Sequence, residues 1–322
     1  MALRRSTKQA DWLQKLKWHS EACLTRLLVA ALKGRTHRTM GQGVRIARTL
    51  AAPVLTKRIQ TAAANLHLVY GDQLTPGQRQ RLAAQSLDSF FLSCLESIIR
   101  PVEAELIQVE GDGLEDMFRC HKEGQGFIVG SLHLGCWDMG LRWLSQHLDN
   151  LSVVHRPARN PYTNLILNGA RSSNSQCHWI SQRDAKAMLL KLRQGEGLVM
   201  MTDLYKGHQA VSVDFLGINT NVAPGPLILS QKAGCPLFPV AHVREDDGRF
   251  RFICGKPLHP TKSETDLKER AGALGRWQEP WINAYAEQYY WINRRWRPRD
   301  GTGQRLRPTG ALAERVLAKV NG

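Results

Sequence analysis

One histidine and one aspartate stand out by their types and their setting. His133 and Asp138 are five residues apart in the segment SLHLGCWDMG. An imidazole, with a typical pKa of about 6.5, can accept a proton from a hydroxyl group at neutral pH. A nearby carboxylate can hold the ring in one tautomer and stabilise the imidazolium that forms. The pair therefore has the chemistry of a general base and its orienting acid.

The setting of His133 carries more information than the spacing. The run GFIVGSL before it predicts a buried strand, Gly135 loosens a turn, and Trp137 opens a helix. In an open α/β sheet, ligands bind beyond the carboxyl ends of strands, where this arrangement places the imidazole. The same interval between a histidine and an acid occurs without such a setting at His67/Asp72, His242/Asp247 and His259/Glu264.

Other chemistry at this segment is less well supported. No serine or cysteine stands at a nucleophile elbow, which favours direct attack by an activated hydroxyl over a covalent enzyme intermediate. Cys136 could act as a nucleophile, but we consider this less favoured than direct attack, because Cys136 lies on the turn between His133 and Asp138, where its thiol can point inward. A purely structural alternative makes His133 a helix cap and Asp138 an acid stabilised by the helix dipole. The sequence shows no cluster with metal-ligand spacing, so we expect neither a metal nor a cofactor.

The elements around the pair predict an α/β domain. Strand and helix alternate, which is typical of a mostly parallel central sheet flanked by helices. We expect a single α/β domain over residues 66–300 and a C-terminal tail over 301–322. The predicted strands are 126–132, 151–154, 198–202, 236–243 and 250–253, and the helices between them are 137–148, 161–172, 184–193 and 224–232.

Residues 1–65 predict a basic, helical N-terminal arm. Residues 9–33 place apolar side chains at mostly helical spacing among lysines and arginines, and a second basic helical stretch covers 44–68. This pattern is typical of an amphipathic helix on a membrane surface, and equally of one packed on the protein's own core. A further helix is expected after Thr75 as the N-cap and Pro76 as the first residue.

The composition predicts a polyanionic partner. The chain has 44 Lys and Arg against 28 Asp and Glu, a net charge of +16. No nucleic-acid-binding motif accompanies this charge, whereas an anionic membrane or a phosphorylated lipid fits it. The longest apolar run has six residues, Leu27 to Leu32, where a spanning helix needs about 20. We therefore expect no transmembrane helix and no secretory signal, and contact with a membrane only at its surface.

The stretch from about Leu66 to Trp296 resembles the late acyltransferases of lipid A biosynthesis. These are the lauroyl and myristoyl transferases within the lysophospholipid acyltransferase superfamily. The matching segments follow in the family's order and are HLGCWD, HRPARNPYTNLILNGAR, LRQGEGLVMMTD, VDFLGINTNVAPGPLILSQKAGCPLFPV and YYWINRRWR.

The resemblance implies an O-acyltransferase that moves a fatty acyl chain from an acyl carrier protein thioester to a lipid hydroxyl. A lipid A precursor is the first candidate acceptor, and coenzyme A is the alternative carrier of the donor. His133 would be the general base and Asp138 the acid of the HX4D motif. Arg156, Arg171 and Asp203 would line the site, with the arginines facing an acceptor phosphate or the developing oxyanion. From the residues alone, Asp203 has N-capping of the next segment as an alternative.

The sequence departs from the family pattern at several positions. Cys136 and Asp138 stand where the family commonly has Asn and Glu, and Val222 stands where it has Thr. The family's proline–tryptophan start of the final segment is replaced here by residues 286–290, and no hydrophobic N-terminal anchor is expected, so the protein would be peripheral on the cytoplasmic face of the inner membrane. Another glycolipid, another hydroxylated lipid or a secondary-metabolite intermediate therefore stays open as acceptor. A catalytically silent, basic protein that binds membranes or nucleic acid is the alternative from another class.

Overall fold

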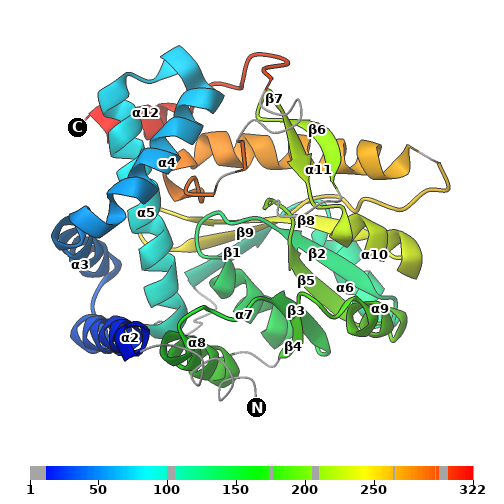
Figure 1. Ribbon diagram of the computed structural model, residues 1–322. Helices are drawn as coiled ribbons and strands as arrows, with labels where there is room; N and C mark the ends of the chain where they lie inside the picture. Colours follow the sequence, from blue (N-terminus) through cyan, green and yellow to red (C-terminus); the bar gives the residue numbers. More distant parts are fainter. Residues whose placement is uncertain are drawn as a thin grey trace.

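The computed structural model describes residues 12–99, 106–174, 177–204, 210–263, 265–293, 295–296 and 304–321. A seven-stranded sheet in the order β1-β9-β8-β2-β5-β3-β4 forms its centre (Figure 1). All neighbouring strands are parallel except β8 and β9. The predicted α/β class is thus confirmed. The strands are β1 (Ile107–Glu110), β2 (Phe127–Ser131), β3 (Leu151–His155), β4 (Cys177–Ser181), β5 (Gly197–Met201), β8 (Leu237–Arg244) and β9 (Phe250–Cys254).

Helices cover both faces of the sheet, so the central strands β2 and β8 are buried along their whole length. On β2, Phe127 and Val129 pack into the core below α6 (Leu114–Lys122) and α7 (Trp137–His147). Ile128 points the other way, into the core shared with α9 (Ala185–Arg193), α10 (Gly225–Ala233) and α11 (Asp266–Ala284). This alternation is the period of two that a pleated strand imposes.

The N-terminal helices lie along one side of the molecule, beside α5 (Figure 1). They are α2 (Trp12–Leu32), α3 (His37–Leu50) and α4 (Ala52–Tyr70). The stretch 44–68, expected as one helix, is divided at Ala51, because Pro53 has no N–H for an earlier carbonyl and fits only the first turn of a helix. The expected boundary between the N-terminal arm and the α/β domain, at residues 65 and 66, lies inside α4. At this position the side chain of Asn65 donates to the backbone oxygens of Trp291 and Asn293.

Helix α5 (Pro76–Ile99) begins as the sequence predicts. The Thr75 hydroxyl accepts from the backbone N–H of Gln78, and the Gln78 side chain accepts from that of Thr75. By length and composition, α5 is long and apolar enough to cross a membrane. The longest uninterrupted apolar run in the sequence did not indicate this, because serines divide the apolar residues of α5 into short runs. Since 56% of its most apolar window is buried inside the protein, a core helix explains it equally well.

Several elements were not foreseen from the sequence. Besides β1, β4 and α6, they include the hairpin of β6 (Val211–Phe215) and β7 (Ile218–Val222), whose turn residues Leu216 and Gly217 have φ of 52° and 73°. Helix α8 (Pro161–Asn174), by contrast, was expected. Short helix η1 (Gly71–Gln73) precedes α5, and η3 (Ala286–Gln288) follows α11. Residues 304–321 end in α12 (Glu314–Asn321). Its Val316 and Val320 are buried in the same hydrophobic core as Ile128 of β2.

A buried ion pair lies between α5 and the sheet. The Arg244 Nε donates to both carboxylate oxygens of Glu96 at 3.0 Å, and the two side chains are 5% and 0% exposed. Burial acts to raise the pKa of Glu96, but the charges of Arg244 and His37 outweigh it and lower the pKa below its ordinary value. Arg244 also donates to the hydroxyl of Ser93, which lies 2.7 Å from the carbonyl oxygen of Gly135.

Replacement of Arg244 tests how much this pair contributes. Arg244→Met leaves a carboxylate buried without its partner, so we expect the free energy of unfolding in urea to fall by about 3–5 kcal/mol. Arg249→Gln is the control, because Arg249 and Asp247 are 60% and 50% exposed, and its effect should stay within about 0.5 kcal/mol. If Arg244→Met does not fold, Glu96→Gln combined with Arg244→Met removes both charges and should recover stability. Equal effects of Arg244→Met and Arg249→Gln would contradict a special role for the buried pair.

Candidate active site

The turn after β2, residues 132–136, carries His133 and is here called the active-site turn. It leads directly from a fully buried strand into α7, as the sequence predicts. Gly135 has φ of 58°, and a Cβ atom there would lie 2.3 Å from the backbone oxygen of His242. Only glycine fits this close approach to β8. The turn therefore holds His133 at the carboxyl end of the sheet.

Asp203 holds His133 by two contacts. Its Oδ1 lies 2.8 Å from Nδ1 of the ring, and its Oδ2 accepts from the backbone N–H of His133 at 2.9 Å. Asp203 follows β5, which pairs with β2 in parallel, so both residues leave the sheet at the same edge. An ionised carboxylate accepts only, which assigns the Nδ1–H tautomer to the neutral ring. Nε2 is then the nitrogen that can accept a proton.

The electrostatics of Asp203 suit this contact. Burial acts to raise the pKa of its carboxyl, yet the charge of His133 and the two hydrogen bonds from it lower the pKa below its ordinary value. Asp203 therefore stays ionised wherever the imidazole gains or loses its proton. A fixed anion at Nδ1 stabilises the imidazolium that forms after proton uptake at Nε2.

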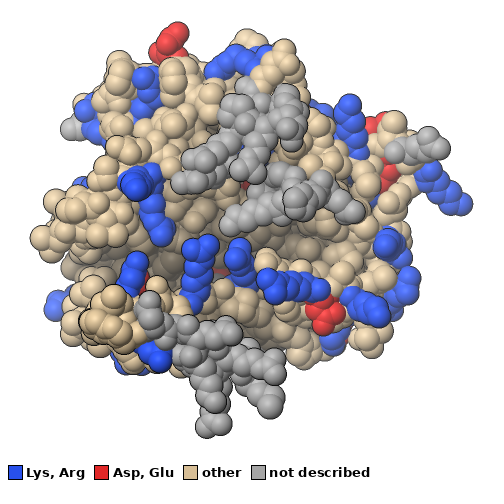
Figure 2. Space-filling view, viewed as in Figure 1, with Lys and Arg blue, Asp and Glu red and all other residues tan. Residues whose placement is uncertain are grey.

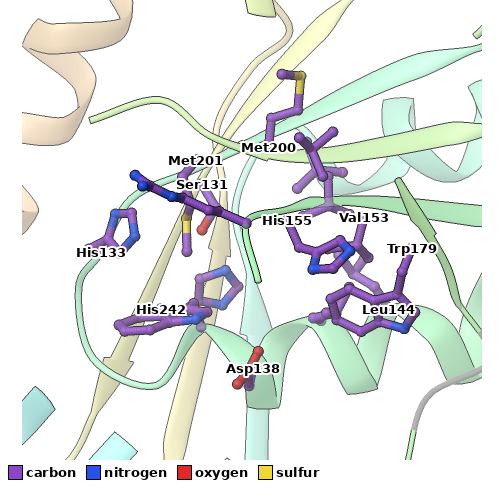
Figure 3. A pocket seen from close by; sticks show the side chains of 16 residues that line it. Ser131, His133, Asp138, Leu144, Val153, His155, Trp179, Met200, Met201 and His242 are labelled. Atoms are coloured by element: carbon purple, nitrogen blue, oxygen red, sulfur yellow. The ribbon is translucent and has the colours of Figure 1, made fainter. Parts of the chain in front are cut away.

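A cavity of about 240 Å³ opens beside His133. In Figure 3, His133 lies at one side of it and Leu144, Val153 and Trp179 at the opposite side, while Asp138 rises from α7 below. Apolar side chains make up most of the wall, which suits a hydrocarbon chain. The polar or charged residues that line it are Ser131, His133, Asp138, His155, Arg156 and His242.

The structure brings Asp138 and Arg156 to the same cavity as His133. Asp138 is 8% exposed and lies in the first turn of α7, whereas the carboxylate seen at Nδ1 is that of Asp203. The role of Asp138 as the orienting acid stays a prediction. Arg156 follows β3 and is exposed to solvent. Arg171 belongs to α8, but its side chain lies outside the described residues.

Cys136 does not have the environment of a nucleophile. It is 1% exposed, and its Sγ lies 3.7 Å from the backbone oxygen of Ser93. Burial, helped by the charge of Glu96, raises the pKa of the thiol well above its ordinary value, so the reactive thiolate is disfavoured. Within the described ranges, no group of three or more His, Cys, Asp and Glu could hold a metal ion.

The sequence did not reveal how the C-terminal part completes the site. Residues 288–293 with 295 and 296, here called the closing block, run along the active-site turn. The backbone N–H of Tyr290 donates to the oxygen of His133 at 3.0 Å, and that of Gly135 donates to Gln288 at 3.2 Å. Arg295 Nη1 donates to the backbone oxygen of Asp203. The density of aromatic residues and arginines was a signal, but spacing could not say what they contact.

Arg156 brings a positive charge to the lining of this cavity. Figure 2 shows lysines and arginines along the hollowed middle of the face that it views. A general base beside an apolar cavity with a basic surface can activate a hydroxyl against an acyl compound whose carrier or acceptor is anionic.

Comparison with known proteins agrees with this chemistry. The family described as bacterial lipid A biosynthesis acyltransferase matches residues 23–298. The chain is 23% identical over 263 residues to the lipid A biosynthesis palmitoleoyltransferase of Escherichia coli K12, covering 80% of this chain and 84% of that protein. The lipid A biosynthesis acyltransferase of Shigella flexneri matches with the same figures. The E. coli lauroyltransferase is 21% identical over 255 residues, with 78% and 82% covered.

The two candidate orienting acids can be separated without any substrate. An asparagine at position 203 can donate to Nδ1 through its amide, so Asp203→Asn should shift neutral His133 toward the Nε2–H tautomer. Asp138→Asn should leave the Nδ1–H tautomer in place. The measurement is the ¹⁵N chemical shifts of the two ring nitrogens, assigned by their loss in His133→Gln. A tautomer change in Asp138→Asn alone would make Asp138 the orienting acid.

Proposed function

Because the chain belongs to the bacterial lipid A biosynthesis acyltransferase family, we propose that it transfers a fatty acyl chain from an acyl carrier protein thioester to a hydroxyl group of a lipid A precursor. Family membership shows that the protein is an acyltransferase. The identity of the donor, the identity of the acceptor and the roles of the individual residues are proposals. The observation that carries the proposal is the contact between His133 Nδ1 and buried Asp203 at the side of a largely apolar cavity.

In the proposed reaction, Nε2 of His133 accepts the proton of the acceptor hydroxyl. The hydroxyl oxygen forms a bond to the thioester carbonyl carbon, and the carbonyl oxygen becomes an oxyanion. Collapse of this intermediate breaks the carbon–sulfur bond, and the imidazolium returns its proton to the departing thiolate. Ionised Asp203 stabilises the imidazolium throughout. The acyl chain is expected to occupy the cavity between His133 and Trp179.

Arg156 and Arg171 are proposed to contact the oxyanion or an acceptor phosphate, which guanidinium groups bind well. Asp138 is the second carboxylate of the proposed site. Acyl carrier proteins are acidic, so a chain with a net charge of +16 suits that donor and anionic lipids alike. Because the curated relatives are only 21–23% identical, another glycolipid or a secondary-metabolite intermediate is the alternative acceptor, and assays should include both classes.

Membrane docking is proposed for the side formed by α2, α3 and α4. Helix α2 buries only Ala22 and Leu32, and its apolar face stays exposed. A second apolar corner joins α3 and α4, where Leu50 and Val54 are 80% and 79% exposed. The large exposed apolar residues on these helices are Trp12, Leu13, Leu16, Leu24, Leu27, Ile46, Leu50 and Val54, and exposed basic residues among them include Lys17, Arg26, Arg45 and Arg58. Such a surface suits the interface of an anionic membrane.

His133→Ala should abolish acyl transfer, because the acceptor hydroxyl loses its base. We expect a loss of about 10²–10⁴-fold in turnover, measured with a lauroyl-carrier-protein donor and radiolabelled lipid A precursor. His259→Ala is the matched control, since His259 is exposed and does not line the cavity. Retention of more than about a tenth of the activity by a folded His133→Ala protein would remove His133 as the base.

Leu50→Asp combined with Val54→Asp should weaken binding to phosphatidylglycerol vesicles by about tenfold or more, because two apolar side chains leave the interface. Leu190→Asp is the control, since Leu190 is 56% exposed on α9. Wild-type binding should also fall on phosphatidylcholine vesicles and at about 0.5 M salt, as co-sedimentation can measure. Binding that ignores both salt and lipid charge would rule out electrostatic docking.

A further inference from the structure

Two buried side chains of the closing block also lie beside Asp203. Arg295 is 6% exposed, and its Nη1 donates to the backbone oxygen of Asp203 at 2.5 Å. Its guanidinium carbon lies 3.9 Å from the centre of the Phe215 ring. Tyr289 is 1% exposed, and its hydroxyl is close enough to the side chains of Asp203 and Arg295 for both to act on its pKa. Burial and the charge of Asp203 raise the pKa of Tyr289, so the phenol stays protonated as a hydrogen-bond donor.

The backbone of the same block holds the residue that Asp203 orients. The N–H of Tyr290 donates to the oxygen of His133, and Tyr289 forms an antiparallel bridge with Leu134. One short segment therefore fixes the active-site turn through its backbone and the carboxylate beside it through its side chains. A segment needed only for packing would not place a cation and a hydroxyl beside the same aspartate.

Arg295 places a buried positive charge beside Asp203. A buried guanidinium is costly unless an anion and hydrogen bonds compensate it. Its Nε has no hydrogen-bond partner within the described part of the chain. The charge of Arg295 lowers the pKa of Asp203, adding to the larger effect of His133 against burial. The cation thus helps to keep Asp203 ionised.

We propose that Arg295 and Tyr289 are positioning residues that act through Asp203. Arg295 balances the charge of the carboxylate, and the Tyr289 hydroxyl donates to it, so that its oxygens keep their places at Nδ1 and at the backbone N–H of His133. The proposal rests on the proposed function only in taking His133 as the general base.

The sign of the effect on pH dependence follows from the charges. Without the cation at position 295, the negative charge of Asp203 is less balanced and favours the imidazolium form of His133. The base is then protonated at higher pH, so the acid limb of the profile of kcat/KM against pH moves up. Loss of the Tyr289 hydroxyl acts in the same direction with a smaller effect. The other titratable or charged groups near His133 and Asp203 stay the same in these variants, namely Asp138, His155, Arg156, His242, Tyr290, and Arg58 beside Tyr290.

The test compares Arg295→Gln, Arg295→Lys and Tyr289→Phe with two controls. In Arg295→Gln, the acid limb should rise by about half to one pH unit and kcat should fall by about tenfold, with little change in KM. Arg295→Lys should restore the position of the limb. Arg315→Gln and Tyr285→Phe should lower Tm and leave the limb in place. Arg315 is a half-buried guanidinium 4.3 Å from the Tyr285 ring, and Tyr285 is a buried phenol bonded to Glu245.

A second readout keeps this test independent of transfer activity. The ¹⁵N shifts of the His133 ring, followed against pH, should show the imidazolium persisting to higher pH in Arg295→Gln than in Arg315→Gln. If the limb and this ¹⁵N titration both stay at their wild-type values while Tm falls in Arg295→Gln, the two residues are structural and the proposal is overturned. If wild-type protein shows no transfer that depends on His133, the proposed function fails, and the ¹⁵N titration still decides the positioning role. If Arg295→Gln does not fold, Tyr289→Phe and Arg295→Lys carry the comparison.

Discussion

The buried carboxylate of Asp203 is the constraint around which the site is arranged. A charge removed from water must be matched by hydrogen bonds and opposite charge, or it destabilises the fold. Here the ring and backbone of His133 supply two hydrogen bonds, and Arg295 supplies a cation. The need to satisfy one carboxylate thus determines where the imidazole lies and which of its nitrogens faces the cavity.

The active-site turn is held by segments that are far apart in the chain. Ser93 of α5 reaches the backbone of Gly135, and the Glu96–Arg244 pair holds Ser93 in place. The closing block contacts the same turn through backbone hydrogen bonds. Since a displacement of a reacting group by about 1 Å can cost a hundredfold in rate, support from several segments is what a general base on a short turn requires.

The surface proposed to meet the membrane is joined directly to the rim of the cavity. Asn160, in the segment after Arg156, donates to the backbone oxygen of Trp18 in α2, and His19 packs against Tyr162 with ring centres 4.0 Å apart. Helix α2 therefore rests on the segment that carries an arginine of the cavity wall.

The sequence by itself determined the elements that depend on local pattern: the buried strand, the glycine turn and helix around His133, the Thr75 cap and the α/β class. It also indicated Asp203 as a residue at a strand end. Only the tertiary structure decided which carboxylate contacts His133, because Asp203 is 70 positions away and meets it through the pairing of β2 with β5. The contacts of Tyr289 and Arg295 were hidden for the same reason. Strand order and the return of the closing block depend on how all layers pack together, and no spacing within one segment reports that.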